Sequence, residues 1–164
     1  MDKISIDVLK ELLPEEKEIV APKAKPRGPQ ADHYTPAILL ERAAYLRKMA
    51  RHGDGSASET LKEYPQHHTM LSFRSRSGEA EVHERFADVF YVLEGHATLV
   101  TGGTVAGART VAPGEMRGDA VDGGARQELR AGDVAHVPAG LPHQMLVPSE
   151  KTFTALVIKI QEIP

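Results

Sequence analysis

Hydrophobic positions follow a helical period before residue 53 and a strand period from residue 66 onward. In residues 35–53, apolar side chains recur at the spacing that places them on one face of a helix. We therefore predict an amphipathic helix here, with Thr35 as the N-cap, Pro36 at the first helical position and Gly53 as the C-cap. The predicted buried face consists of Leu39, Ala43, Leu46 and Ala50.

The segment before this helix is predicted to form an N-terminal arm. Residues 4–13 carry an apolar stripe and end at Pro14, which predicts a short helix. Residues 20–30 contain three prolines and a glycine and are typical of an extended linker. This arm is either a simple tether or a segment that wraps another subunit. We divide the chain into a helical arm and linker, 1–58, and a barrel domain, 59–164, with a loop over 53–59.

Short apolar runs separated by glycine and proline predict an all-β domain, either a sandwich or a barrel. Glu94 and Gly95 are interpreted as a tight turn between two strands. The glycine-rich stretch 102–124 is long for a connection, and it is either a functional loop or a variable surface insertion. The expected strands cover residues 67–73, 81–85, 89–93, 96–101, 109–112, 127–130, 134–138, 143–147 and 152–160.

Polar side chains alternate at the start of the second of these strands. Glu81, His83 and Arg85 would share one face, because successive residues of a strand point to opposite sides. Asp88 has the parity of the apolar residues Phe90 and Val92, so it could point toward the interior. Carboxylates and an imidazole that converge there would be costly to bury unpaired. A metal ion would satisfy them together, and so would a salt-bridge network that includes Arg85.

Composition narrows the class of protein. The 164 residues have a formal net charge of -3, with basic and acidic residues intermixed, so we expect no nucleic-acid partner. The chain contains no cysteine, which excludes disulfides, thiolate metal sites and a cysteine nucleophile. We find no signal-peptide core and no apolar stretch long enough to span a bilayer. We therefore expect a cytoplasmic protein that is not bound to a membrane.

The stretch GDVAHVPAGLPHQMLV resembles the second sequence motif of the cupin superfamily. It matches that motif through Gly132, Pro138, Gly140 and His143, whereas Val147 stands where the family has asparagine. The first family motif is degenerate here. Asp88 has the family's glutamate-to-glycine spacing to the following Gly95, which places His83 and Glu81 at the positions of the family's two histidines.

A second alignment starts the first motif at His83 and places Arg85 on the next histidine position. Its gap to Asp88 is too short, so we prefer the first alignment. The resemblance implies a cupin-type double-stranded β-helix, or jelly-roll barrel, with an N-terminal helical arm. It also implies a divalent transition metal, Fe, Mn, Zn or Ni, whose ligands would be Glu81, His83, Asp88 and His143.

The function implied by the resemblance is Lewis-acid or oxygen chemistry on a small polar metabolite. His136 or His67 would be the acid/base residue, since imidazole titrates near neutral pH. Arg74 and Arg117 either bind a carboxylate substrate or are solvated. The alternative function is a metal-free sensor or storage protein that binds a small ligand without turnover. Many cupins form dimers, so we expect a homodimer.

Overall fold

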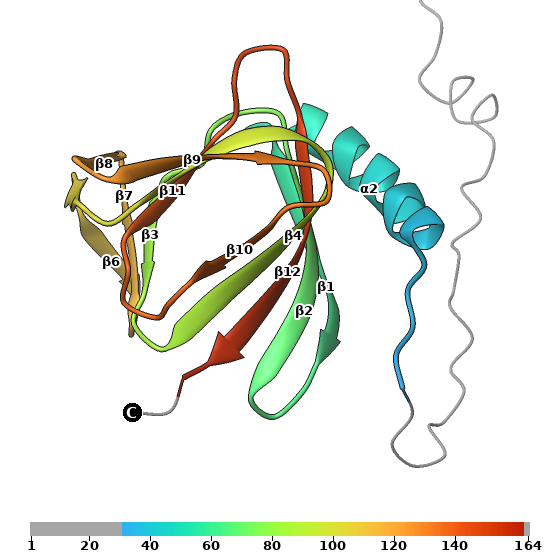
Figure 1. Cartoon of the computed structure of the whole chain (residues 1–164), viewed down its shortest axis with the longest axis horizontal. Helices are drawn as coiled ribbons and strands as arrows, with labels where there is room; N and C mark the ends of the chain where they lie inside the picture. The colour runs from blue at the N-terminus through green and yellow to red at the C-terminus, as the bar shows by residue number, and fades with distance from the viewer. Residues whose placement is uncertain (1–30, 163–164) are drawn as a thin grey trace, which may run out of the picture. The chain divides into compact units, whose positions relative to one another are not determined.

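The computed structural model describes residues 31–162, and the expected helix at 4–13 and linker at 20–30 lie outside this range. The first described element is the helix α2, Pro36–Arg51, shown in cyan in Figure 1. The hydroxyl of Thr35 accepts a hydrogen bond from the Ile38 amide, which confirms the predicted N-cap. The predicted C-cap was wrong by one residue, because His52 has that position and keeps a right-handed helical conformation.

The helix α2 packs on β1, Ser56–Glu63, and β2, His67–Arg74. β1 begins within the stretch 53–59 that was expected to be a loop. Successive residues of β2 point to opposite sides, so the strand presents one face to the helix and the other to the barrel interior. Leu71 and Phe73 contact the helix, whereas Met70, Ser72 and Arg74 line a pocket on the other side. The helix residues of this contact are the predicted stripe, Leu39, Ala43, Leu46 and Ala50.

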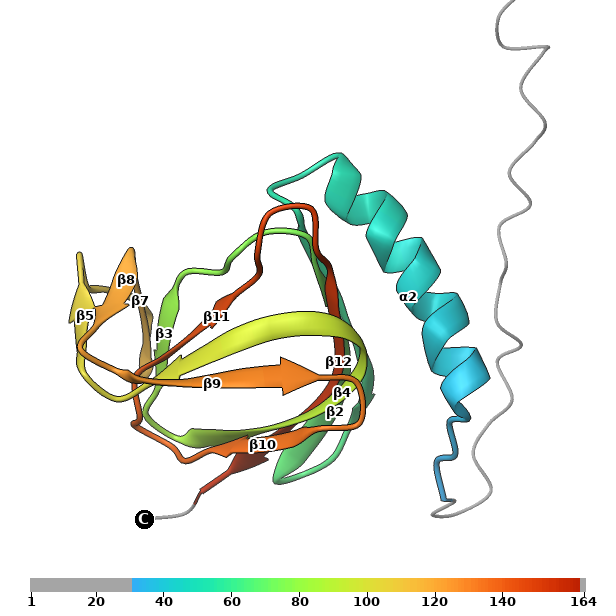
Figure 2. The same cartoon turned by 45° about the horizontal axis from the view of Figure 1, so that its top comes forward.

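Ten strands form one antiparallel sheet that curls into a barrel-like shape (Figures 1 and 2). One half has the strand order β1-β2-β12-β4-β10, and the other half has the order β9-β4-β11-β3-β7-β6. The other strands of this sheet are β3 Ala80–His83, β4 Phe86–Thr101, β6 Arg109–Ala112, β7 Glu115–Gly118, β9 Ala125–Arg130, β10 Val134–Val137, β11 His143–Leu146 and β12 Phe153–Gln161.

Strand β4 belongs to both halves. Its first part pairs with β12 and β10, and its last part pairs with β9 and β11. The change occurs near Gly95, whose φ of 89° is in the region that favours glycine. The predicted turn at Glu94 and Gly95 was therefore wrong: the chain bends there within one continuous strand.

The glycine-rich stretch 102–124 contains four strands, of which only β6 was predicted. Two of them, β5 Thr104–Ala106 and β8 Ala120–Asp122, form a separate antiparallel pair. Strand β7 pairs with β3 along its whole length and thereby joins the barrel wall. This part of the stretch is a structural element of the barrel.

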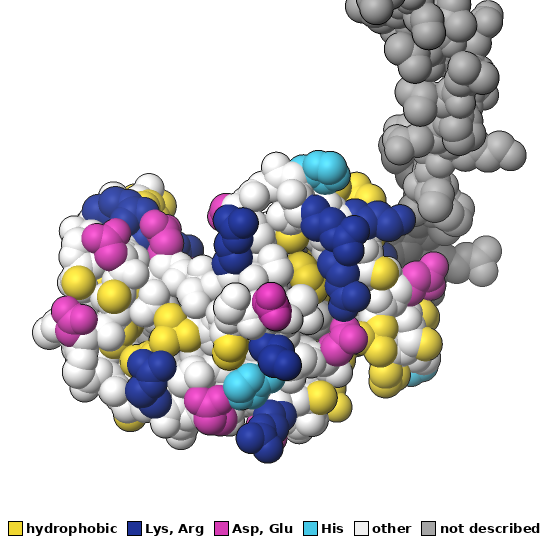
Figure 3. Space-filling model, turned by 90° about the horizontal axis from the view of Figure 1, so that it is seen from above, with side chains coloured by type: hydrophobic (Ala, Val, Ile, Leu, Met, Phe, Trp, Pro, Cys, Tyr) yellow, Lys and Arg dark blue, Asp and Glu magenta, His cyan; other side chains and the backbone are white. Residues whose placement is uncertain are grey.

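The barrel interior has an apolar end and a polar end. Eleven buried hydrophobic residues form the apolar core, including Val92, Leu99, Val137 and Phe153. The polar end holds the buried residues His83, Asp88 and His143. On the face shown in Figure 3, acidic and basic side chains are interspersed. Among the described residues, no helix combines the length and apolar character that a membrane span requires.

Candidate metal site

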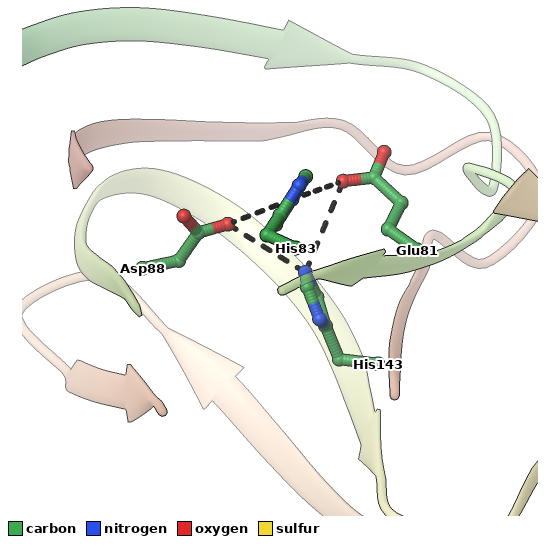
Figure 4. Close-up of side chains that lie close together, drawn as sticks. All are labelled: Glu81, His83, Asp88 and His143. Carbon is green, nitrogen blue, oxygen red and sulfur yellow. Dashed lines mark ion pairs between the residues drawn. The ribbon is translucent and has the colours of Figure 1, made fainter. Parts of the chain in front are cut away.

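The four residues predicted from the sequence as metal ligands lie close together in the structure (Figure 4). Glu81 and His83 lie on the same side of β3 because they are two residues apart. Their neighbour on β11 is His143, which is paired in register with Glu81. The chain then turns the corner at Glu84 and Arg85, and Asp88 enters from the first part of β4.

One donor atom from each side chain faces a common point. The Nε2 atom of His83 lies 3.2 Å from Glu81 Oε2 and 3.5 Å from Asp88 Oδ2. The Nε2 atom of His143 lies 3.8 Å and 3.6 Å from the same two oxygens. Ligands about 2.1 Å from one tetrahedral ion are roughly 3.4 Å apart. The four donors therefore have the spacing of ligands to a single ion.

The outward nitrogen of each imidazole is held by an acceptor. His143 Nδ1 lies 3.1 Å from the carbonyl oxygen of Leu141, which can only accept, so Nδ1 donates and a neutral imidazole in this orientation has its lone pair on Nε2. His83 Nδ1 lies 2.6 Å from Glu115 Oε2. Acceptors at this position orient metal-binding histidines in proteins. Both side chains thus direct Nε2 into the cluster.

His83 Nε2 is buried and forms no hydrogen bond of normal geometry with a described protein group. The carboxylates of Glu81 and Asp88 lie only at ion-pair distance from it. A buried polar atom without a partner is uncommon and requires an explanation. A metal ion at the common point of the four donors would provide its missing partner. The residues present therefore fit a divalent transition metal, with two imidazoles and two carboxylates as donors.

Electrostatic coupling within the cluster is strong. Burial alone would lower the pKa of His83, but the carboxylates of Asp88 and Glu81 outweigh it and raise this pKa to about 9. Burial would raise the pKa of Glu81, but His83 and the neighbouring cations lower it to about 2. The pKa of Asp88 is also lowered against burial, by His143, His83 and Lys159. Both carboxylates are ionised at neutral pH, as metal ligands must be.

Three cationic side chains surround the cluster. Lys159 Nζ lies 2.7 Å from Asp88 Oδ1, which leaves Asp88 Oδ2 directed at the histidines. Arg74 Nη2 lies 3.6 Å from Glu81 Oε1, and Arg117 Nη1 lies 3.9 Å from Glu81 Oε2. All three line the same cavity of about 270 Å³, which also contains the four candidate ligands.

Three residues that the sequence suggested for this region lie elsewhere. His136 is exposed, because the buried residues of β10 are its neighbours Ala135 and Val137. His67 is exposed and stacks on the Tyr64 ring at 4.3 Å between ring centroids. β3 ends at His83, so Arg85 does not share the face of Glu81 and is exposed at the corner. None of the three lines the cavity.

Two contributors to the site were not identified from the sequence. Glu115 comes from β7, where Glu115 and Arg117 alternate with Met116 and Gly118, a strand signal that was hidden among glycines. Lys159 is a charged residue inside the otherwise apolar run ALVIKI of β12. Its parity with Val157 and Ala155 could have indicated that its side chain enters the barrel.

Glu115→Gln is expected to weaken metal binding about 10- to 100-fold, because the amide oxygen can still accept from His83 Nδ1 but the negative charge that raises the basicity of this ligand is lost. The measurement is competition for Zn²⁺ against a chelator. The matched control is Glu128→Gln, since Glu128 Oε2 contacts His96 Nε2 at 2.5 Å on the outside of the barrel. An equal loss in both variants would contradict an orienting role for Glu115.

Comparison with models of known protein families and with curated proteins finds no match. Solved structures do match. The protein TT1209 of Thermus thermophilus is 20% identical with a TM-score of 0.53, covering 74% of this chain and 93% of that one. A Klebsiella pneumoniae protein with a double-stranded β-helix domain is 16% identical, with a TM-score of 0.48 and coverages of 65% and 76%.

The cupin domain of Cnp3 from Schizosaccharomyces pombe is 12% identical, with a TM-score of 0.48, covering 65% of this chain and 61% of that one. At these identities the likeness concerns the fold. The match to TT1209 agrees with the curled antiparallel sheet described above. The chain has the cupin fold, a double-stranded β-helix barrel preceded by a helix.

Proposed function

We propose that this protein binds one divalent transition metal through Glu81, His83, Asp88 and His143 and acts on a small polar metabolite in the adjoining cavity. The observation that carries the proposal is the convergence of four donor atoms on one point. The Nδ1 atom of each histidine, which faces away from this point, has a hydrogen-bond acceptor. Two imidazoles and two carboxylates suit Fe, Mn, Zn or Ni, and the donor set does not select among them.

A metal bound there would supply Lewis-acid polarisation of a substrate oxygen or, if it is iron, chemistry with dioxygen. The residues of the chain would position the substrate around it. Arg74, Arg117 and Lys159 place positive charge at the cavity wall, whereas the apolar side chains of Phe90 and Met145 exclude water from its inner part. Neither His136 nor His67 lines this cavity, so proton transfer within it would use other groups. Lys159, which lines the cavity and pairs with Asp88, is the candidate for this role.

A second function is a metal-free barrel that binds a small ligand without turnover. It is favoured by the ion pairs already present: Lys159 neutralises Asp88, the two arginines flank Glu81, and His83 is charged at neutral pH when no metal is bound. In this case the cluster is a structural salt-bridge network.

Elemental analysis of the purified protein, before and after incubation with Fe, Mn, Ni, Cu and Zn salts, separates the two functions. One equivalent of a transition metal supports the first. No bound metal after reconstitution overturns it and leaves the salt-bridged pocket.

Metal binding at pH 7.5 is expected to release about one proton, because a ligand must be deprotonated and the pKa of His83 is about 9 without metal. Calorimetric titration with Zn²⁺ in two buffers of different ionisation enthalpy measures this number. Repeating it at pH 9.5 is the control, since His83 is then largely neutral and the release should decrease. A release that is absent at pH 7.5 would contradict His83 as a ligand.

The homodimer and the cytoplasmic location remain predictions from the sequence. The mass of the full chain in solution, measured by light scattering, checks the first of these. A mass of one chain would contradict it.

A further inference from the structure

We propose that the ligand of this cavity is a small carboxylate with an apolar tail, and that Arg74 and Arg117 bind its carboxylate group. This inference rests on the proposed function and specifies its substrate class. It is carried by three features of the cavity: two guanidinium groups without a bidentate partner, an excess of positive charge beside a bound metal, and an apolar inner wall.

The two arginines approach the cluster from different strands. Arg117 extends from β7, beside Glu81 on the neighbouring strand, and Arg74 reaches Glu81 from β2 in the other half of the barrel. Their side chains are 25% and 24% exposed. Both guanidinium groups therefore lie on the Glu81 side of the cluster, whereas Lys159 pairs with Asp88, which Figure 4 shows on the other side of the two histidines.

Neither guanidinium makes a close, two-pronged contact with a carboxylate among the described residues. The distances to Glu81, 3.6 and 3.9 Å, exceed those of ordinary hydrogen bonds. Arg117 Nη1 donates to the Met116 carbonyl at 3.3 Å and lies 3.5 Å from Glu115. Planar guanidinium groups bind carboxylates in pairs of parallel hydrogen bonds, and both groups retain donors for such a partner.

The charge of the cavity favours an anion once a metal is bound. Its lining contains three cationic side chains, Arg74, Arg117 and Lys159, and three anionic ones, Glu79, Glu81 and Asp88. A divalent ion would leave an excess of two positive charges on the lining, or of one when Glu115, which contacts His83 and Arg117, is included. Glu79 also forms an ion pair with Arg109, which does not line the cavity, so part of its charge is already neutralised. A carboxylate would reduce this excess of positive charge.

The rest of the lining determines what the carboxylate is attached to. Met70, Phe90, Met145, Phe153 and Val157 form an apolar wall. Arg74 is paired in register with Phe153, so the guanidinium side of the cavity adjoins this wall. The volume of about 270 Å³ is below the roughly 300–1,000 Å³ of drug-sized sites. A short carboxylate with a hydrocarbon tail matches both parts, whereas inorganic phosphate would leave the apolar wall uncovered.

The test compares isovalerate with isovaleramide, two probes of the same shape that differ in charge. Each is titrated by calorimetry into metal-loaded protein whose metal content has been measured. Isovalerate is expected to bind at least about tenfold more tightly than the amide, and Arg74→Gln and Arg117→Gln should each reduce its affinity at least about tenfold. The control is Arg126→Gln, since Arg126 is exposed on β9 outside the cavity.

The outcomes separate this inference from the function on which it rests. Metal-loaded protein that binds both probes equally, or that binds inorganic phosphate more tightly than isovalerate, overturns the carboxylate assignment and leaves the metal site intact. Isovalerate binding that both arginine variants retain overturns the role of these residues. Failure of the wild-type protein to hold metal at all counts against the proposed function instead.

Discussion

His143→Ala is expected to reduce metal affinity by roughly 100-fold or more while the protein remains folded. Structural zinc sites gain about 10–16 kcal/mol from all their ligands together, so one of four ligands is worth about 3 kcal/mol. His143 supplies one of the two imidazole donors, and its Nδ1 atom is already held by the Leu141 carbonyl. Metal content after dialysis and chelator competition measure the loss, and circular dichroism checks the fold.

His136→Ala is the matched control, because it removes an exposed imidazole on β10. It should keep the metal content of the wild-type protein. His83→Ala should behave like His143→Ala, since both histidines face the same two carboxylate oxygens. Wild-type metal content in His143→Ala would exclude the four-residue site, even if the protein binds metal elsewhere.

Gly95→Ala is expected to lower the free energy of unfolding by about 2–5 kcal/mol. A Cβ atom at this position would lie 1.9 Å from the carbonyl oxygen of Thr152, which is a backbone atom that also accepts a hydrogen bond from the His96 amide. The φ of 89° adds a backbone penalty of about 1–2 kcal/mol for any residue with a side chain. Relieving the contact requires the start of β12 to move, at a further cost of about 1–3 kcal/mol.

Gly132→Ala separates these two causes. Gly132 has a similar φ of 93°, but a Cβ atom there would meet nothing within 4 Å. This variant should lose only the backbone penalty, about 1–2 kcal/mol. Urea denaturation of both variants provides the comparison. Equal losses at the two positions would show that the close approach at Gly95 is relieved at no cost.

Local patterns were sufficient to predict α2 and most strands, because these elements display one periodicity without interruption. The stripe from Leu39 to Ala50 is the buried face of the helix, as its spacing indicated. The bend of β4 at Gly95 could not be predicted in this way. A glycine with positive φ serves equally in a tight turn and in a bulged strand, and the choice depends on Thr152, a distant residue.

The candidate ligands were predictable because strand parity and motif spacing agreed on them. Parity placed Glu81 and His83 together, and the motif added His143, which pairs with Glu81 across 62 positions of sequence. The surrounding residues were harder to predict. Arg117 and Glu115 depend on the pairing of β7 with β3, and no local pattern specifies which strand a short glycine-flanked segment will join.

The shared strand β4 also has a consequence for the way the protein opens. Its amides are flanked by β12 and β10 over the first part and by β11 and β9 over the second. The two halves of the barrel cannot separate unless β4 loses its hydrogen bonds to the neighbouring strands. Partial opening of the barrel should therefore not expose the central amides of β4 to solvent exchange. Their exchange rates should therefore report the stability of the whole barrel, whereas the helix α2, which packs mainly on β1 and β2, is able to detach at lower free energy.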